Sequence, residues 1–230
     1  MKMINLSLSN KMNKVFLILL LVTISVPLAL FAAQNNGSLK RAVSADTIGP
    51  TEIEFTIYLD GIGNIGDSTN PDSTGSNKDP DLYVKYLKIS FYDRVSRLVL
   101  TKTELLKFNY GQGAYKTQVE LDNELPTGEY SIKVKVDGYL QRALPNRHIQ
   151  KGSIISFPAV NLIAGDLNGN NRLDIIDYHI LTGCYSDVLP PTFCYPESNE
   201  IISDLSSDGK VNQLDYNLFM REIRVYEKGE

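Results

Sequence analysis

The sequence has no tryptophan, two histidines and two cysteines among its 230 residues. Proteins that bind sugars by stacking need aromatic faces, and here tryptophan is missing while the tyrosines form no stripe. Two cysteines make a poor structural zinc site, which usually takes four cysteine or histidine ligands. These shortages argue against zinc binding and weaken, without removing, the case for a carbohydrate-binding module.

Motifs for covalent or metal-assisted catalysis are missing as well. The chain has no G-x-S-x-G, no H-E-x-x-H and no phosphate-binding loop. His148 stands in a predicted turn, and His179 stands in a predicted helix close to Asp177. A sandwich of roughly 110 residues leaves little room for a glycosidase cleft. We therefore expect a protein that is not an enzyme.

The chain also lacks a basic cluster. Its formal charge is −4, but the first 33 residues carry three lysines and no acid, so the remainder has 20 basic and 27 acidic residues. A net charge of −7 over that part argues against nucleic acid or anionic lipid as a partner. Such a balance suits a protein that collects cations.

One long apolar run is present near the N-terminus. Residues 15–33, "VFLILLLVTISVPLALFAA", follow three lysines and contain no charge. Nineteen residues approach the roughly 20 that span a bilayer and exceed the 7–15 of a signal-peptide core. Cleavage after Ala33 would place Phe31 where a small residue is required. We expect 1–33 to be a transmembrane signal anchor in the cell membrane, single-pass with the body outside; a cleaved signal and a secreted protein are the alternative.

After a polar tether at 34–50, the pattern from 51 to 162 is that of an antiparallel β-sandwich. Apolar residues alternate in 52–59, and turn residues separate this segment from similar ones. The further predicted strands are 83–92, 96–102, 114–121, 129–136 and 152–162. The long loop at 60–81 holds five aspartates without fixed spacing, so we expect a solvated loop.

"LPTGEYSIKVKVDGYL", residues 125–140, resembles the penultimate strand of carboxypeptidase-regulatory-like and similar Ig-like surface sandwiches. The resemblance implies a spacer or stalk and no chemistry.

Short oxygen-bearing side chains crowd into "GDLNGNNRLDIIDYHIL", residues 165–181. Counted from Asp166, they occupy the positions 1, 3, 5, 7, 9 and 12 of an EF-hand-type calcium loop, in which position 7 uses its backbone carbonyl. Calcium takes six to eight hard oxygens, which explains the preference for Asp and Asn. The predicted ligands are Asp166, Asn168, Asn170, Arg172, Asp174 and Asp177.

A second copy of this pattern begins 38 residues later, at Asp204. Both copies start with Asp-Leu, carry an aliphatic residue at position 8 and place Asp-Tyr at positions 12 and 13. An internal repeat that preserves ligand spacing and apolar positions together predicts two calcium sites that pack against each other. The second set is Asp204, Ser206, Asp208, Lys210, Asn212 and Asp215.

Two calcium loops, each followed by a helix and with no helix before the first, resemble a dockerin over about residues 164–226. The resemblance implies a small all-α module at 163–227 that binds two Ca²⁺ ions and docks a cohesin-like protein or another surface protein. Dockerin partner contacts fall at helix positions 10 and 11, which here are Ile175, Ile176, Gln213 and Leu214. These residues differ from the usual Ser-Thr pair, so the partner is not specified. Whether one isoleucine faces the core instead stays open.

Cys184 and Cys194 lie ten residues apart between the two loops. Because an exported chain meets oxidising conditions, we expect them to form a disulfide.

These observations together predict a multidomain α and β protein: an N-terminal membrane or signal helix, an antiparallel β-sandwich and a dockerin-like calcium module. The expected function is calcium-dependent protein docking by a non-catalytic surface or secreted protein, which the dockerin resemblance associates with polysaccharide-degrading assemblies. The alternatives are a carbohydrate-binding sandwich, or a spacer whose calcium module packs on its own chain.

Overall fold

The computed structural model describes residues 49–63, 77–122, 124–186, 194, 196 and 198–227, which lie in a compact unit from Ile48 to Glu230. The described residues form these strands: β1 (Thr51–Leu59), β2 (Val84–Tyr92), β3 (Leu98–Asn109), β4 (Ala114–Asp122), β5 (Gly128–Lys135), β6 (Gly138–Tyr139), β7 (Arg142–Ile149), β8 (Ile154–Ser156), β9 (Val160–Leu162) and β10 (Ala164–Asp166). The helices are α2 (Ile175–Cys184), α3 (Ser198–Ser203) and α4 (Gln213–Glu227).

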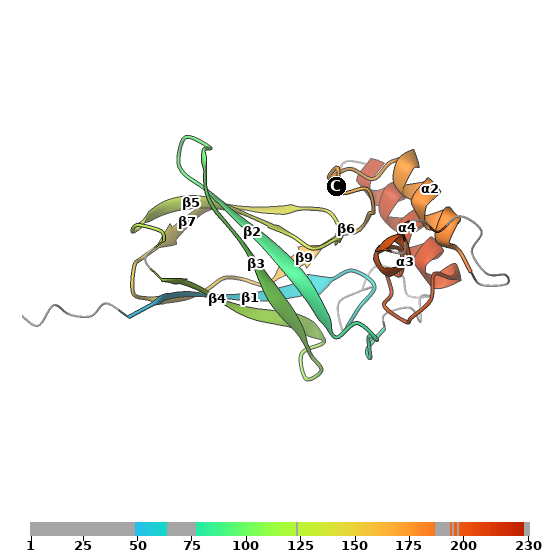
Figure 1. Cartoon of the computed structure of the whole chain (residues 1–230), viewed down its shortest axis with the longest axis horizontal. Helices are drawn as coiled ribbons and strands as arrows, with labels where there is room; N and C mark the ends of the chain where they lie inside the picture. The colour runs from blue at the N-terminus through green and yellow to red at the C-terminus, as the bar shows by residue number, and fades with distance from the viewer. Residues whose placement is uncertain are drawn as a thin grey trace, which may run out of the picture. The chain divides into compact units, whose positions relative to one another are not determined.

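The main sheet has the strand order β7-β5-β2-β3-β4-β1-β8, with β9 also paired to β1 (Figure 1). It folds over between β3 and β4, whose register covers only the pairs from Lys107–Lys116 to Asn109–Ala114 beside their hairpin. The neighbouring pairs are antiparallel except those of β1 with β8 and β9, which are parallel. The predicted antiparallel sandwich is therefore present with parallel strands at one edge.

Alternation of apolar residues places the core between the two layers. In β1, Ile53, Phe55 and Ile57 are fully buried while the residues between them face outward. In β2, Ile89 and Phe91 are buried from the opposite layer. Period-2 alternation of this kind is what one buried and one solvated face require.

Strand β7 was not predicted. Its sequence, RALPNRHI, lacks apolar alternation and contains a proline, and His148 was expected in a turn. In the structure β7 lies at the end of the sheet order, where Pro145 costs no ladder hydrogen bond on the inner side. His148 Nδ1 lies 2.8 Å from Glu129 Oε1 on β5, so this histidine belongs to a cross-strand pair.

The expected small all-α module is wrong. The described residues are mostly β, and the segment after the sandwich begins with a strand, β10, that pairs with β6. Its apolar residues Leu205, Leu218 and Phe219 join the same buried cluster as Tyr139 and Ala164. Two short loop-and-helix units cannot bury their own apolar faces, so they bury them against the sandwich.

The expected membrane anchor is corrected too. The helices that the structure describes have 10, 6 and 15 residues, and none is long and apolar enough to cross a membrane. The predicted transmembrane segment 15–33, the tether up to residue 48 and most of the loop 60–81 lie outside the described residues. The structure therefore gives no support to a single-pass location in the cell membrane.

An ion-pair cluster joins the end of β1 to α4. Arg221 Nη2 lies 2.9 and 3.0 Å from the two carboxylate oxygens of Asp60, and its Nε donates to Glu222 Oε1 at 2.6 Å. Burial, followed by the charge of Glu222, raises the pKa of Asp60 to about 8, although Arg221 opposes the shift. Two carboxyl groups therefore share one guanidinium, and a proton is favoured on Asp60.

Because Asp60 has an unfolded-state pKa near 3.8, the folded chain holds a proton between pH 5 and 8 that the unfolded chain lacks. We expect the unfolding free energy to fall as pH rises through this window, by at most about 1.4 kcal/mol per pH unit. Asp60→Asn should flatten the decline in urea unfolding curves measured at pH 5, 6, 7 and 8. The control is Asp93→Asn, because backbone hydrogen bonding from Arg97 lowers the pKa of Asp93 and keeps it ionised throughout. Equal slopes for Asp60→Asn and the wild type would contradict the assignment.

Candidate functional site

The two aspartate-rich loops have the same backbone path. Positions 4 and 6 are left-handed in both: φ is 75° at Gly169 and 64° at Asn171, and 53° at Ser207 and 85° at Gly209. Glycine and asparagine tolerate this region better than other residues, which explains their use at position 6. The sequence repeat is thus also a repeat of local structure.

In the first loop, backbone N–H groups converge on two carboxylates. Asn171 N donates to Asp166 Oδ2 at 3.0 Å. Asn168 N and Asp174 N donate to the two oxygens of Asp177, each at 2.9 Å. Asp174 is the N-cap of α2 and forms a capping box with Asp177, so the start of the helix fixes position 12 of the loop.

The second loop repeats these bonds at equivalent positions. Gly209 N donates to Asp204 Oδ2 at 2.9 Å, while Ser206 N and Asn212 N donate to Asp215 at 2.8 Å each. At position 7 of each loop, the amide of Arg172 or Lys210 donates to the Oδ1 of position 5. In both loops, hydrogen bonds from backbone N–H groups to carboxylates therefore hold the loop in shape.

Burial of these carboxylates raises the free energy of their ionised forms. Asp166, Asp177 and Asp215 have no exposed surface, and Asp204 is 7% exposed. Burial raises the pKa of Asp177 and of Asp204, and raises the pKa of Asp215 to about 6, against the effect of the backbone N–H donors. Burial therefore disfavours the ionised forms, and a bound cation would favour them.

The donor set fits a hard cation. Asp166 Oδ1 is buried and has no hydrogen-bond partner among the described residues. In loop two, one oxygen each from Asp204, Asp208 and Asp215 lies within 4.8 Å of the others. All these donors are oxygens, which suits calcium or magnesium and not softer metals. The other predicted ligands, among them Asn168, Asn170 and Ser206, line the same two turns.

The sandwich holds both loops through contacts that sequence reasoning missed. Lys135 of β5 forms an ion pair with Asp166, and Gln141 N donates to Asn171 Oδ1 at 2.6 Å. Tyr139 Oη donates to Leu205 O at 3.2 Å. Asn77 Nδ2 donates to the carbonyls of Ser206 and Ser207 at 3.0 and 2.8 Å. No local sequence pattern identifies these residues, because each contacts a residue at least thirty positions away in the sequence.

The residues at positions 10 and 11 are exposed. Ile175 is 62% exposed, Ile176 53% and Leu214 44%, and Gln213 is also on the surface. These side chains are therefore not part of the core. Tyr185 Oη, just after the end of α2, lies 3.3 Å from the amide oxygen of Gln213 at the start of α4.

The two helices therefore run antiparallel. Between them, the rings of Tyr178 on α2 and Tyr216 on α4 lie with their centroids 6.3 Å apart. The Ile175–Ile176 pair and the Gln213–Leu214 pair lie at opposite ends of this helix pair. The structure therefore does not gather the four predicted contacts into one small patch.

Cys184 and Cys194 form a disulfide with 4.3 Å between their Cα atoms. The bond links the last residue of α2 to the segment before α3. It therefore fixes part of the connection between the two loops.

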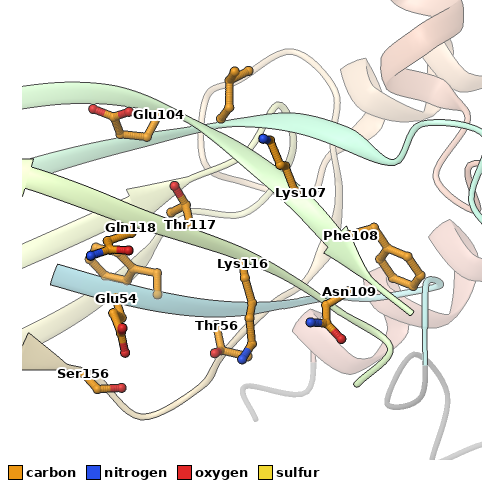
Figure 2. A pocket seen from close by; sticks show the side chains of 12 residues that line it. Glu54, Thr56, Glu104, Lys107, Phe108, Asn109, Lys116, Thr117, Gln118 and Ser156 are labelled. Atoms are coloured by element: carbon orange, nitrogen blue, oxygen red, sulfur yellow. The ribbon is translucent and has the colours of Figure 1, made fainter. Parts of the chain in front are cut away.

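A hollow of about 630 Å³ lies between β3 and β4, where the strands diverge from their hairpin (Figure 2). Its charged lining residues are Glu54, Glu104, Lys107 and Lys116. The rings of Phe55 and Phe108 also contribute, but they are 1% and 8% exposed. The hollow thus offers hydrogen bonds and charges of both signs without an open aromatic face.

Comparisons with known proteins assign no family. No family model matches the chain, and no curated protein matches it. Crystal structures of a C-terminal and an N-terminal interface mutant of a type II cohesin–X–dockerin complex from Acetivibrio cellulolyticus are similar at 14% identity, with TM-scores of 0.42 and 0.41, over 75% of this chain and 94% of those chains. A putative adhesin from Bacteroides ovatus is similar at 15% identity and a TM-score of 0.29, over 50% of this chain and 47% of that chain. Likenesses this distant carry no argument about function.

The raised pKa values give a prediction about cation binding. A cation binds ionised carboxylates, and burial raises the pKa of Asp215 to about 6, so protons compete with the ion below that pH. We expect calcium affinity at loop two to be nearly constant between pH 7 and 8 and to fall by up to tenfold per pH unit between pH 6 and 5. Isothermal titration calorimetry across pH 5 to 8 measures this. Constant affinity down to pH 5 would show that Asp215 is not a ligand.

Proposed function

We propose that this protein is a non-catalytic, calcium-binding interaction module. The observation that carries the proposal is the buried, partnerless Oδ1 of Asp166, together with the three converging carboxylates of loop two. A polar atom that is buried without a partner costs free energy, and a bound cation removes that cost. Calcium would supply the positive charge that lets each loop keep its carboxylates ionised.

Each loop would hold one Ca²⁺ ion through its side-chain oxygens and one backbone carbonyl. The proposed ligands are Asp166, Asn168, Asn170, the Arg172 carbonyl, Asp174 and Asp177 in loop one, and Asp204, Ser206, Asp208, the Lys210 carbonyl, Asn212 and Asp215 in loop two.

The face of α2 and α4 that is turned away from the sandwich would receive the partner. Their inner face is covered, because Leu181 and Phe219 are fully buried in the shared core. Ile175 and Ile176 stand on the first turn of α2, directly after the ligand Asp174, so an occupied loop would fix their position. Adjacent exposed isoleucines are typical of protein-docking surfaces.

The resemblance of the two loops to dockerin loops implies a cohesin-like domain, or another surface protein, as this partner. By the same resemblance, the protein would act in an assembly that degrades polysaccharides.

A second candidate is carbohydrate binding by the sandwich. Tyr83, Tyr86 and Tyr110 are 60%, 64% and 61% exposed, and Tyr86 lies beside exposed Leu105 on the outer face of β2 and β3. Exposed tyrosine rings can stack on sugars. This face differs from the calcium loops, so the two functions are independent.

Calcium stoichiometry tests the proposal directly. We expect two ions per chain, and one ion per chain in either Asp177→Ala or Asp215→Ala, because each variant removes the carboxylate at position 12 of one loop. Calorimetric titration of the full chain after chelation gives the number. Asp93→Ala, which removes a half-buried aspartate from a turn of the sandwich, should still bind two. Zero ions in the wild type would sink the proposal.

The docking surface has its own test. We expect Ile175→Ser combined with Ile176→Thr to leave calcium binding intact and to lower partner affinity at least tenfold, since burying each isoleucine contributes roughly 1.5–3 kcal/mol. Crosslinking of the chain to surface proteins of the producing cells, with and without chelator, shows whether a calcium-dependent adduct is lost. Ile201→Ser, on α3 and 59% exposed, is the matched control. If the adduct survives in the double variant and is lost in Ile201→Ser, the docking surface does not include Ile175 and Ile176.

A further inference from the structure

The first loop receives a positive charge from outside itself. Lys135, the last residue of β5, places its Nζ against Oδ2 of Asp166. The Lys135 side chain is 15% exposed, and the Asp166 side chain is fully buried. Ion pairs in such a poorly solvated place are screened much less than pairs on the surface.

The two oxygens of Asp166 are used differently. Oδ2 accepts from Lys135 and from Asn171 N, whereas Oδ1 is the buried oxygen without a partner. The Lys135 ammonium therefore leaves Oδ1 of Asp166 available to a cation. A calcium ion on Oδ1 and the ammonium on Oδ2 would share one carboxylate, and their positive charges would repel.

Loop two lacks this arrangement. Among the described residues, the donors to Asp204 all belong to its own loop: Asp208 N, Gly209 N and the Ser206 hydroxyl. In the part of the chain that the structure describes, no lysine or arginine forms an ion pair with Asp204, Asp208 or Asp215. Lys85 of β2 interacts with Asp204 only through the longer-range field.

The two loops therefore differ in whether a lysine contacts an aspartate of the loop directly. Each loop contributes three aspartates, and each has one basic residue at position 7, Arg172 or Lys210. These contributions are the same in both loops, so the difference lies in the lysines outside them. Lys135 contacts Asp166 of loop one directly, whereas Lys85 acts on Asp204 of loop two only through its field.

We propose that Lys135 is the built-in counter-ion of loop one: it keeps this loop folded without calcium and lowers its calcium affinity, so that loop two fills first. The inference rests on the proposed calcium sites and adds an order of filling. It also makes the sandwich part of the calcium response, because a strand residue sets the affinity of a loop thirty residues away. Lys135 acts through Asp166 and is a positioning residue.

Site-specific titration by NMR tests the proposal on the full chain, with Ca²⁺ as the only added ligand. The amide of Asn171, which donates to Asp166 Oδ2, reports on loop one, and the amide of Gly209, which donates to Asp204 Oδ2, reports on loop two. In the wild type we expect Gly209 to shift at lower calcium than Asn171. In Lys135→Met we expect the loop-one affinity to rise about tenfold, equivalent to about 1.4 kcal/mol, because the repulsion is removed.

The same variant gives a second readout without calcium. In excess chelator, the Asn171 amide should be protected from hydrogen exchange in the wild type and exchange faster in Lys135→Met, because Asp166 loses its partner. Lys135→Arg keeps the charge and should restore both the protection and the weaker affinity.

Lys133→Met is the matched control, since Lys133 is two residues away on β5 and lies over the ring of Tyr92 at 4.8 Å. It should behave as the wild type does. The Gly209 amide shows whether each variant is folded. Calcium shifts at both amides with unchanged loop-one affinity in Lys135→Met would overturn the counter-ion role, as would loop one filling first in the wild type. A wild-type chain without calcium shifts at either amide would instead overturn the proposed calcium function.

Discussion

The structure around the two loops depends on one constraint: carboxylates that are buried must meet positive charge or donated hydrogen bonds. Asp166, Asp177 and Asp215 are completely buried. Backbone N–H groups of the loops point inward and donate to these carboxylates, because the residues at positions 4 and 6 are left-handed. Helix α2 begins at Ile175 because Asp174 caps it, and the buried Asp177 completes the capping box. Loop shape and helix start thus have a common cause.

The same constraint explains why the helical part does not stand alone. Its buried residues Leu205, Leu218 and Phe219 share a core with the sandwich, and β10, which ends at Asp166, pairs with β6. Gly61 shows how close the contact is, since a Cβ there would lie 2.4 Å from a methyl group of Leu218. The loops are consequently packed against the sandwich and share its core.

Much of the local structure could be predicted from the sequence. Alternation located β1, β2, β4 and β5 to within about two residues, the repeat placed both loops in register, and the aliphatic residues at position 8, Leu173 and Val211, are buried as a repeat of core positions requires. These features are encoded by neighbours along the chain.

The rest depends on tertiary contacts that leave no local pattern. Strand β7 carries charges and a proline because an edge strand tolerates them, so its sequence resembles a loop. Lys135 fits the outward alternation of β5 and gives no sign that it meets Asp166. The packing of the helices on the sandwich was predicted only as an alternative, because an apolar helix face shows that a partner surface exists and does not identify it.

The parallel pairing of β1 with β8 and β9 has a consequence for the order of assembly during synthesis. Ile53 pairs with Ile155, and Ile57 pairs with Val160, about a hundred residues further along the chain. The edge of the sheet cannot close until that stretch has left the ribosome. Pairing between segments so far apart in sequence also costs loop-closure entropy. Asp166 follows this closing stretch by only four residues, so the sandwich that supports loop one is completed just as the loop emerges. The strands that support loop one can therefore pair before loop two has been synthesised.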